Sequence, residues 1–305
     1  MDATAVTVRV PASTANLGPG FDCLGLALAL WNEVTFSRTG EGIRVEVSGL
    51  GAGELPAGED NLIARGALRV FARCGEAPPQ GLAIRCESRI PPCSGMGSSA
   101  AAVLSGLLGG NALLGGPLSQ EEILRMAVEA EGHPDNAAAA LLGGLVISAG
   151  AGEELLVRRV PVAPVRLVVV TPEYDLSTRQ ARAALPRQVS REDAVFNLGR
   201  AALTVEALRA GDYELLRRAM QDRLHQPHRL PLIPGATQAF RAALDHGAAA
   251  AALSGAGPSL IAFAPQGLER IGEAMAAAFS AAGLASRVRC LDASGEGAAV
   301  DARML

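Results

Sequence analysis

The hydrophobic pattern of the first part of the chain predicts short strands. Residues 4–10 alternate apolar and polar side chains, and residues 33–48 do so again around a Gly-Glu-Gly turn at 40–42. Such alternation is typical of half-buried strands, and a glycine turn between two of them favours a hairpin. Another strand is expected over residues 82–90, where an apolar run ends at two prolines.

Helical spacing of apolar residues follows between and after these strands. Residues 61–74 show that spacing, and residues 100–114 form an apolar run long enough for a buried helix. Ser119 and Glu122 stand at the separation of a capping box, which predicts a helix from there to about residue 131.

The second part of the chain repeats this mixture. Glycine and proline within residues 150–164 indicate a boundary, and a β-branched strand follows at 165–171. Helices are expected over 193–210 and 212–224, and the apolar segment 248–263 contains another glycine turn.

This order of elements predicts an α+β fold of two domains, each built on a mostly antiparallel sheet. We place the N-terminal domain at residues 1–160 and the C-terminal domain at 161–305. A content of 49% hydrophobic and 19% charged residues is that of an ordinary globular protein.

Charge and cysteine content limit the partners and the compartment. A net charge of −4 gives no general attraction to nucleic acid or to an anionic membrane. The longest apolar stretches, such as 137–146, are shorter than the roughly eighteen residues of a membrane span. The N-terminus shows no signal peptide, and the five cysteines are odd in number and scattered, which favours reduced thiols. We therefore expect a cytoplasmic protein with no nucleic-acid or membrane partner.

The chain contains no lysine, so all 27 basic residues are arginine. P-loop nucleotidases and protein kinases both place a lysine on the phosphates of ATP. Schiff-base chemistry needs a lysine nucleophile. These three classes are excluded, whatever the cause of the bias, which a GC-rich genome would explain.

A glycine–serine loop is the most informative motif. Residues 90–102 read Ile-Pro-Pro-Cys-Ser-Gly-Met-Gly-Ser-Ser-Ala-Ala-Ala, between a predicted strand and a predicted helix. The exposed N–H groups at a helix N-terminus bind anions, and the Ser98 and Ser99 hydroxyls can reach a phosphate or a magnesium ion. The structural alternative is a glycine turn with a serine cap.

Four other segments concentrate polar groups. Residues 11–22 include Asn16 and Asp22 among turn formers; a solvated turn is the alternative. Residues 129–136 combine two glutamates with His133, Asp135 and Asn136, and oxygen ligands of this kind suit Mg²⁺, although a lone His133 would also suit a helix end. The basic segments 177–182 and 225–235 could converge on an anionic substrate, or their arginines could form surface ion pairs.

Together these segments resemble the GHMP kinase superfamily, named for galactokinase, homoserine kinase, mevalonate kinase and phosphomevalonate kinase. The similarity covers the whole chain and follows the family order: Pro-Ala-Ser-Thr-Ala-Asn at 11–16, the glycine–serine loop, and Gly-Ala-Gly-Pro-Ser at 255–259. Within the superfamily, the segments 11–22, 133–136, 177–182 and 227–235 are similar to the homoserine kinases. The resemblance implies an N-terminal domain like domain 2 of ribosomal protein S5 and a ferredoxin-like C-terminal domain.

The resemblance implies ATP and Mg²⁺ as cofactors. Asn61 would contact the adenine, and Ser98, Ser99 and Glu129 would hold Mg²⁺. Met96 departs from the usual leucine of this loop, and the stretch from glutamate to His133 is shorter than in some homoserine kinases. The loop around the ATP phosphates would consist of Pro91, Pro92, Cys93, Ser94, Gly95, Met96, Gly97, Ser98, Ser99, Ala100 and Ala101.

The resemblance to homoserine kinases also implies transfer of the γ-phosphate of ATP to the hydroxyl of L-homoserine, in threonine biosynthesis. Asp22 would take the ammonium, and Arg182 and Arg229 the carboxylate. Asn16 and His133 would complete the substrate site. Thr178 would lie beside the transferred phosphate, and Asn136 and Arg182 are further catalytic candidates. Asp135 is either the general base or a structural or water-ordering group; in the second case a phosphate oxygen would take the hydroxyl proton directly. Relatives are commonly homodimers, which sets the same expectation here. The alternatives are another GHMP kinase, such as mevalonate kinase, diphosphomevalonate decarboxylase, or a nucleotide-binding regulator without catalysis.

Overall fold

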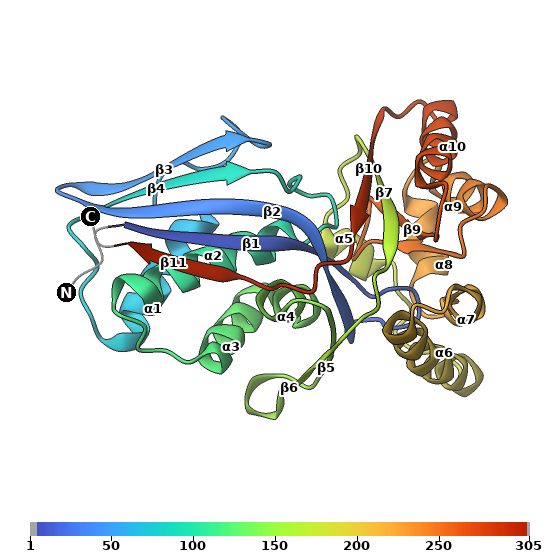
Figure 1. Ribbon diagram of the computed structural model, residues 1–305, viewed down its shortest axis with the longest axis horizontal. Helices are drawn as coiled ribbons and strands as arrows, with labels where there is room; N and C mark the ends of the chain where they lie inside the picture. Colours follow the sequence, from blue (N-terminus) through green and yellow to red (C-terminus); the bar gives the residue numbers. More distant parts are fainter. Residues whose placement is uncertain (1–4, 304–305) are drawn as a thin grey trace.

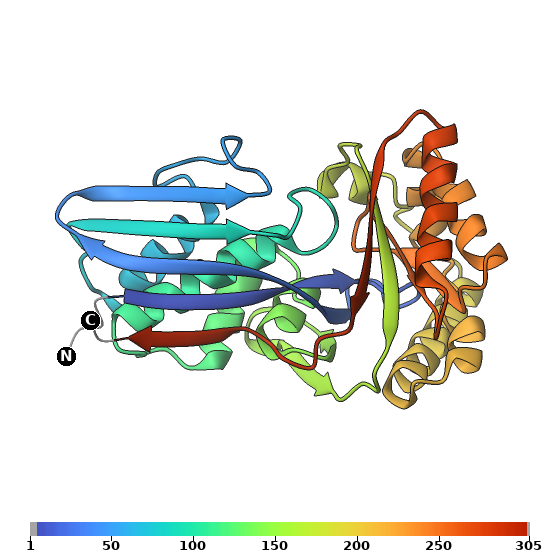
Figure 2. The same cartoon turned by 45° about the horizontal axis from the view of Figure 1, so that its top comes forward.

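The first sheet extends along most of the molecule. The structure is a computed structural model that describes residues 5–303. Within that range seven strands form this sheet, in the order β11-β1-β2-β4-β3, with β5 paired to β2 and β6 paired to β5 (Figures 1 and 2). Their bounds are β1 (Ala5–Ala15), β2 (Leu24–Thr39), β3 (Gly42–Gly49), β4 (Gly81–Ser88), β5 (Leu145–Ala149), β6 (Leu156–Val160) and β11 (Ala299–Arg303).

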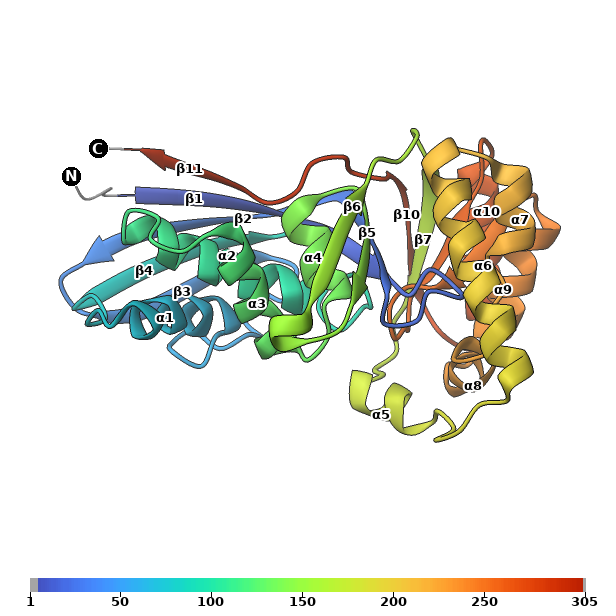
Figure 3. The same ribbon diagram turned by 90° about the horizontal axis from the view of Figure 1, so that it is seen from below.

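Helices cover one face of this sheet, as the view from below shows (Figure 3). Helix α2 packs closely against α1, because a Cβ on Gly106 would lie only 2.1 Å from the Ile63 carbonyl oxygen. It is apolar on all sides and therefore buried. The bounds of these helices are α1 (Leu62–Cys74), α2 (Ser98–Leu113), α3 (Gln120–Glu131) and α4 (Asp135–Leu142), with a short 3-10 turn η1 (Gly152–Glu154) before β6.

The second sheet has the order β10-β7-β9-β8 and is entirely antiparallel. Helices α9 and α10 pack on it around a core of its own, while α6 and α7 pair with each other at the outer edge (Figure 3). The bounds of its strands are β7 (Arg166–Pro172), β8 (Ala250–Leu253), β9 (Leu260–Phe263) and β10 (Ser286–Asp292). The helices are α5 (Thr178–Ala183), α6 (Arg191–Ala210), α7 (Tyr213–Ala219), α8 (Gln226–Arg229), α9 (Ala236–Asp245) and α10 (Leu268–Ala281), with a 3-10 turn η2 (Leu230–Leu232).

The hairpin predicted across residues 33–48 is wrong. Strands lie on both sides of the 40–42 turn, but β3 pairs in parallel with β4, and β4 lies between β2 and β3. Burial explains the choice. Strand β4 buries Leu82, Ile84 and Cys86, whereas β3 buries only Val45 and so occupies the edge.

The predicted boundary coincides with the passage of the chain from one sheet to the other. Strand β6 ends at Val160 in the first sheet, and β7 begins at Arg166 in the second. The predicted C-terminal range differs in one respect, because β11 returns to the first sheet and pairs with β1. The domain bounds of 1–160 and 161–305 stay a prediction.

Other elements differ from expectation at their ends. Helix α2 begins at Ser98, two residues before the predicted start, and α3 has the predicted capping box. Helix α7 ends at Ala219 instead of residue 224, because the Asp222 carboxylate accepts hydrogen bonds from the backbone of the next turn. None of the helices in residues 5–303 has both the length and the hydrophobicity needed to cross a lipid bilayer.

Candidate active site

Three glycine-containing segments, far apart in sequence, meet between the two sheets. Backbone hydrogen bonds join the first two at Ser13 N to Met96 O (3.2 Å), and the first and third at Gly255 N to Ala15 O (3.1 Å). The Ser254 hydroxyl lies 2.8 Å from the Gly95 carbonyl oxygen and donates there or to Thr14. The three motifs that the sequence analysis considered separately therefore form one structure.

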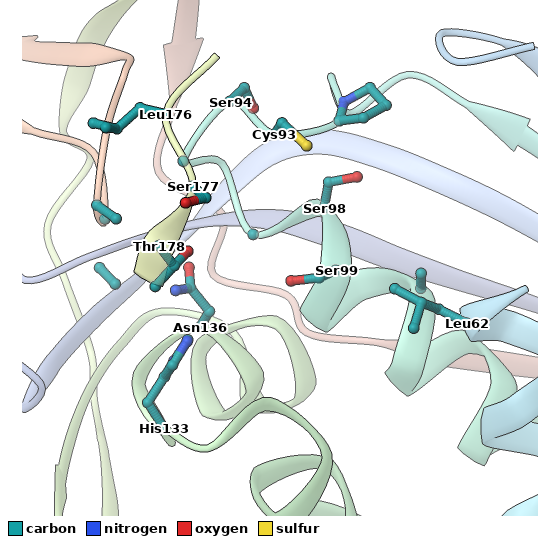
Figure 4. A pocket seen from close by; sticks show the side chains of 18 of the residues that line it. Leu62, Cys93, Ser94, Ser98, Ser99, His133, Asn136, Leu176, Ser177 and Thr178 are labelled. Atoms are coloured by element: carbon teal, nitrogen blue, oxygen red, sulfur yellow. The ribbon is translucent and has the colours of Figure 1, made fainter. Parts of the chain in front are cut away.

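A cavity of about 520 Å³ lies over this junction. One end is formed by the glycine–serine loop and the start of α2, and the other by α5, Arg229 and the loop between β1 and β2. Figure 4 shows Ser98 and Ser99 at the start of α2, with Thr178, Asn136 and His133 on another side of the pocket. Such a cleft can hold two small substrates side by side.

The start of α2 offers free backbone N–H groups to the cavity. Its N-cap is Gly97, which has a left-handed conformation and no capping side chain. Ala101 N donates to Gly97 O, which leaves the N–H groups of Ser98, Ser99 and Ala100 without an intrahelical acceptor. This is an anion site, strengthened by the dipole of a 16-residue helix.

Two glycines of the loop are required by their surroundings. Gly95 and Gly97 have φ of 78° and 69°, a region that favours glycine. A Cβ on Gly95 would lie 2.2 Å from the Ser254 carbonyl oxygen, and one on Gly97 would lie 2.2 Å from the Ser13 hydroxyl. The loop is thus held in place by the other two segments.

Not every predicted loop residue faces the cavity. Met96, Ala100 and Ala101 are at most 1% exposed and pack in the core below the loop. Neither these three nor Pro91 lines the cavity. The predicted loop residues that do line it are Pro92, Cys93, Ser94, Gly95, Gly97, Ser98 and Ser99.

The carboxylate beside the loop is Glu131. The Ser99 hydroxyl donates to Glu131 Oε2 at 2.6 Å. Glu129, the predicted magnesium ligand, is exposed, and neither glutamate is among the residues that line the cavity. Glu129 as a ligand therefore stays a prediction, and the contact with Ser99 makes Glu131 the alternative. The paired oxygens of Ser99 and Glu131, next to a phosphate-binding helix end, are of the type that Mg²⁺ prefers.

Asn61 lines the cavity, but its amide is used within the protein. It caps α1 by accepting a hydrogen bond from Ile63 N at 2.9 Å, and it donates to Pro56 O at 2.7 Å. Next to it the cavity wall is apolar, which suits a flat heterocycle such as adenine. This wall, which the sequence analysis did not predict, includes Val47, Leu55, Leu62, Cys86 and Ala102.

At the opposite end, Arg182 and Asp22 form a bidentate ion pair. Both guanidinium–carboxylate distances are 2.8 Å, and this hydrogen bonding raises the pKa of Arg182. Asp22 has a φ of 52° and is held by a hydrogen bond from its backbone N–H to Asn16 Oδ1. The two groups predicted to bind opposite ends of an amino acid thus already contact each other.

Arg229 is a buried cation without a carboxylate partner among the described residues. Its side chain is 1% exposed and lines the cavity. The guanidinium donates to two backbone carbonyls, Ala181 O at 3.3 Å and Gly255 O at 3.5 Å, and lies 3.5 Å from His225 Nδ1. Burial, and then the nearby Arg182, lower the pKa of Arg229 to about 10, so it stays charged at neutral pH. An unbalanced buried charge favours an anionic ligand.

His133, Asp135 and Asn136 form one hydrogen-bonded group. Asp135 Oδ1 lies 2.9 Å from His133 Nδ1 and accepts from Asn136 N at 2.7 Å. This bond to Asp135 raises the pKa of His133. Ser13 donates to Asn136 Oδ1 at 3.0 Å, which connects the group to the N-terminal segment.

Comparisons with known proteins agree with this geometry. Models of the GHMP kinase N-terminal and C-terminal domains match residues 61–144 and 204–281. Homoserine kinase from Moorella thermoacetica is 47% identical over 96% of this chain and 99% of its own length. The chain belongs to the homoserine kinase family.

Other members of the homoserine kinase family support the assignment. The enzyme from Halothermothrix orenii is 46% identical over 90% of this chain and 89% of its own. The crystal structure of homoserine kinase from Cytophaga hutchinsonii superposes with a TM-score of 0.87, at 32% identity and 98% coverage of both chains. A mevalonate kinase from L. major, at 17% identity and a TM-score of 0.69, shares the fold alone. The predicted two-domain GHMP kinase fold is thereby confirmed.

Several site residues were not predicted from the sequence. Glu131 was one of two glutamates in a candidate segment, and nothing in the sequence distinguished it from Glu129. Phe21 has the Arg229 guanidinium 5.0 Å and the Arg182 guanidinium 5.7 Å from its ring centre, a contact that no linear motif encodes. Leu176 also lines the cavity without having been predicted. Ser177 and the 255–257 turn line it too; both belong to segments singled out in the sequence, where no individual role was assigned to them.

Proposed function

We propose that this chain is an ATP-dependent homoserine kinase that converts L-homoserine to O-phospho-L-homoserine. One observation supports this above the others. A single cavity has an anion-binding helix end on one side, and on another side a carboxylate–arginine pair beside a second, unbalanced arginine. The first suits the phosphates of ATP, and the second suits a zwitterionic amino acid.

ATP would occupy the end of the cavity next to α2. Its phosphates would meet the N–H groups of Ser98 and Ser99, and its base would lie against the apolar wall beside Asn61. Mg²⁺ would be held by Glu131 with Ser98 or Ser99, and the Ser99–Glu131 hydrogen bond supports this donor set. When bound, the ion would neutralise charge on the phosphates.

Homoserine would occupy the opposite end. Its ammonium would bind Asp22, and its carboxylate would bind Arg182 and Arg229. Asp22 and Arg182 neutralise each other without substrate. When homoserine binds, its ammonium and carboxylate would replace the contacts that these two side chains make with each other. Neither Asp22 nor Arg182 would thus be left uncompensated in the empty site, whereas Arg229 would gain its carboxylate partner only when homoserine binds.

In the transfer step, the homoserine hydroxyl oxygen forms a bond to the γ-phosphorus as the bond to the bridging oxygen of ADP breaks. Thr178 and Asn136 line the space between the two ends and would orient the reacting groups. Asp135 already accepts hydrogen bonds from His133 and from Asn136 N, which supports an orienting role. The hydroxyl proton would then pass to a phosphate oxygen.

The cellular setting follows from this reaction. We propose that the enzyme serves threonine biosynthesis in the cytoplasm, where ATP is available. We also propose that it is a homodimer. Exposed apolar side chains along α6 support this, since Val195, Leu198 and Leu203 are 61%, 72% and 44% exposed.

An acceptor panel tests the proposal. ADP release is measured with ATP and Mg²⁺ on homoserine, mevalonate, galactose and shikimate, and phosphorus NMR identifies the product. We expect turnover on homoserine alone, and its loss when Mg²⁺ is chelated. Activity on mevalonate without activity on homoserine would refute the substrate assignment, and ATP binding without turnover on any acceptor would favour the regulator. The Ser98→Ala, Ser99→Ala double variant should keep its fold but lose turnover.

A further inference from the structure

A buried polar cluster lies behind the amino-acid end of the cavity, and neither of the proposed substrates would touch it. It consists of Asn197 on α6, Asp222 in the turn after α7, and His225 at the start of α8. Asn197 is 2% exposed, and the side chains of Asp222 and His225 are 0% exposed. Polar groups this deeply buried need hydrogen-bond partners, and the partners show what the cluster holds.

Asp222 organises the segment that carries Arg229. Its Oδ1 accepts from Leu224 N at 2.9 Å and from Asn197 Nδ2 at 2.7 Å. Its Oδ2 accepts from His225 N at 3.0 Å and from Gln226 N at 2.7 Å. Helix α8 has only four residues, too few to be stable alone, so this carboxylate fixes its start. The position of Arg229, in the last turn of α8, depends on it.

Two members of the cluster also hold the loop between β1 and β2. His225 Nε2 donates to Gly18 O at 2.7 Å, and Asn197 Nδ2 lies 3.3 Å from Pro19 O. In Figures 1 and 3 this loop extends from the first sheet to the helices around the second. It carries Asn16 and Asp22 in the left-handed region, with φ of 70° and 52°. Such conformations persist only where the surroundings impose them.

His225 connects the loop directly to Arg229. Because its Nε2–H donates to Gly18 O, the neutral ring has its lone pair on Nδ1, which lies 3.5 Å from Arg229 Nη1. The imidazole also stacks on Phe21 with ring centres 5.2 Å apart, and Arg229 lies over the same Phe21 ring. One buried ring therefore contacts the loop on one side and the arginine on the other.

We infer that Asn197, Asp222 and His225 are positioning residues for the amino-acid subsite. They fix the position of the Asn16–Asp22 loop relative to Arg229. This inference rests on the proposed function. Their hydrogen bonds reach that loop and α8, and none reaches the phosphate loop. Substitutions in the cluster should therefore change the KM for homoserine and leave the KM for ATP almost unchanged.

Substitutions of His225 test the inference. Glutamine places an amide nitrogen as many bonds from Cβ as the imidazole Nε2, so His225→Gln keeps the donor to Gly18 O. Asparagine is one carbon shorter and does not reach. We expect His225→Asn and His225→Leu to raise the KM for homoserine by about 10-fold or more, the equivalent of one buried hydrogen bond, and His225→Gln to stay within about 3-fold. The KM for ATP should change less than about 2-fold in all three variants.

His228→Leu is the matched control, because His228 lies three positions further along the same short helix and does not line the cavity. Its homoserine KM should equal that of the wild type. Equal KM values for the Gln and Asn variants, or an equal rise for ATP and homoserine, would overturn the inference; if the Leu variant does not fold, the Gln–Asn comparison decides. A wild-type enzyme inactive on homoserine would instead refute the proposed function, and the inference with it.

Discussion

Glu129 and Glu131 stand two residues apart near the end of α3, so their side chains point about 200° apart around the helix axis. One is exposed to solvent, and the other reaches the Ser99 hydroxyl. At the scale of single residues, direction from the backbone decides which of two identical groups can take part in chemistry.

The first prediction compares these two glutamates. Glu131→Gln should lower kcat by about 100-fold or more, because a ligand of the proposed magnesium site loses its charge. Glu129→Gln should remain within about 2-fold of wild type. Both are measured by ADP release over a range of Mg²⁺ concentrations. Equal losses in the two variants would argue against Glu131 as a ligand.

The second prediction concerns Arg229. Arg229→Leu should raise the KM for homoserine by about 100-fold, the loss of a charge-assisted contact, and the KM for ATP far less. Arg217→Leu is the control, since Arg217 is exposed and pairs with Glu214 on the surface. A parallel rise for both substrates would contradict the carboxylate role.

At the scale of elements, the site depends on where helices begin. Helix α2 begins at a left-handed glycine with no capping side chain, so its first N–H groups face the cavity. Helix α8 begins where the buried Asp222 carboxylate accepts hydrogen bonds from the backbone of His225 and Gln226, and the His225 imidazole donates to Gly18 O in the loop after β1. Both starts are local in sequence, but each is held by a segment far away in the chain.

The third prediction tests the start of α2. Gly97→Ala combines an unfavourable φ with a contact at 2.2 Å to Ser13, and Gly116→Ala has a similar φ of 80° with nothing within 4 Å. We expect Gly116→Ala to lower the free energy of unfolding by about 1 kcal/mol, and Gly97→Ala by a further 1–3 kcal/mol or so, with weaker ATP binding. Urea denaturation and nucleotide titration measure both. Equal effects of the two substitutions would show that the contact with Ser13 is unimportant.

The fourth prediction follows from burial of His225 at the start of α8. Burial lowers the pKa of His225, although Asp222 acts in the opposite direction and Arg229 in the same one. The pKa of His225 in the folded protein thus lies below its unfolded value of about 6.5. The contribution of neutral His225 to the free energy of unfolding is therefore complete above about pH 6.5 and is lost as the pH falls through the folded pKa.

The unfolding free energy of the wild type should therefore fall more between pH 7.5 and 5.5 than that of His225→Gln. Urea denaturation at the two pH values measures the difference. A variant with the same pH dependence as the wild type would show that His225 does not contribute.

At the scale of the whole molecule, the chain crosses between the sheets twice and the cavity lies where they meet. The loop after β1 packs against the second part of the chain, and β11 returns to pair with β1. Residues from both parts of the chain thus line one cavity. Helix α6 lies at the outer edge of the second part and exposes apolar side chains.

The fifth prediction tests the proposed dimer. Leu198 is 72% exposed on α6, so Leu198→Glu should leave the monomer fold unchanged but introduce a charge at an apolar contact. We expect light scattering to show a dimer for the wild type and at least a 10-fold weaker association for the variant, by about 1.4 kcal/mol or more. Glu153→Gln, in the exposed turn η1 of the first part, is the control. A monomeric wild type would refute the dimer, and an unaffected dimer would exclude α6.

The sequence by itself determined the chemistry that this protein can use. The absence of lysine excluded three ways of binding phosphate or carbonyl groups, and the loop at 91–101 with the motifs at 11–22 and 255–259 indicated the family. Strand alternation and the capping box at Ser119 located most elements, because these signals are local: they depend on neighbours within a few residues.

Only the tertiary structure decided which groups meet. It placed β4 between β2 and β3, brought Glu131 to the Ser99 hydroxyl and paired Asp22 with Arg182 across 160 positions. It also buried Arg229 with no carboxylate partner among residues 5–303. The physical reason is that these outcomes depend on side-chain direction and on burial between segments distant in the chain. Neither quantity is encoded in the spacing of residues along a single segment.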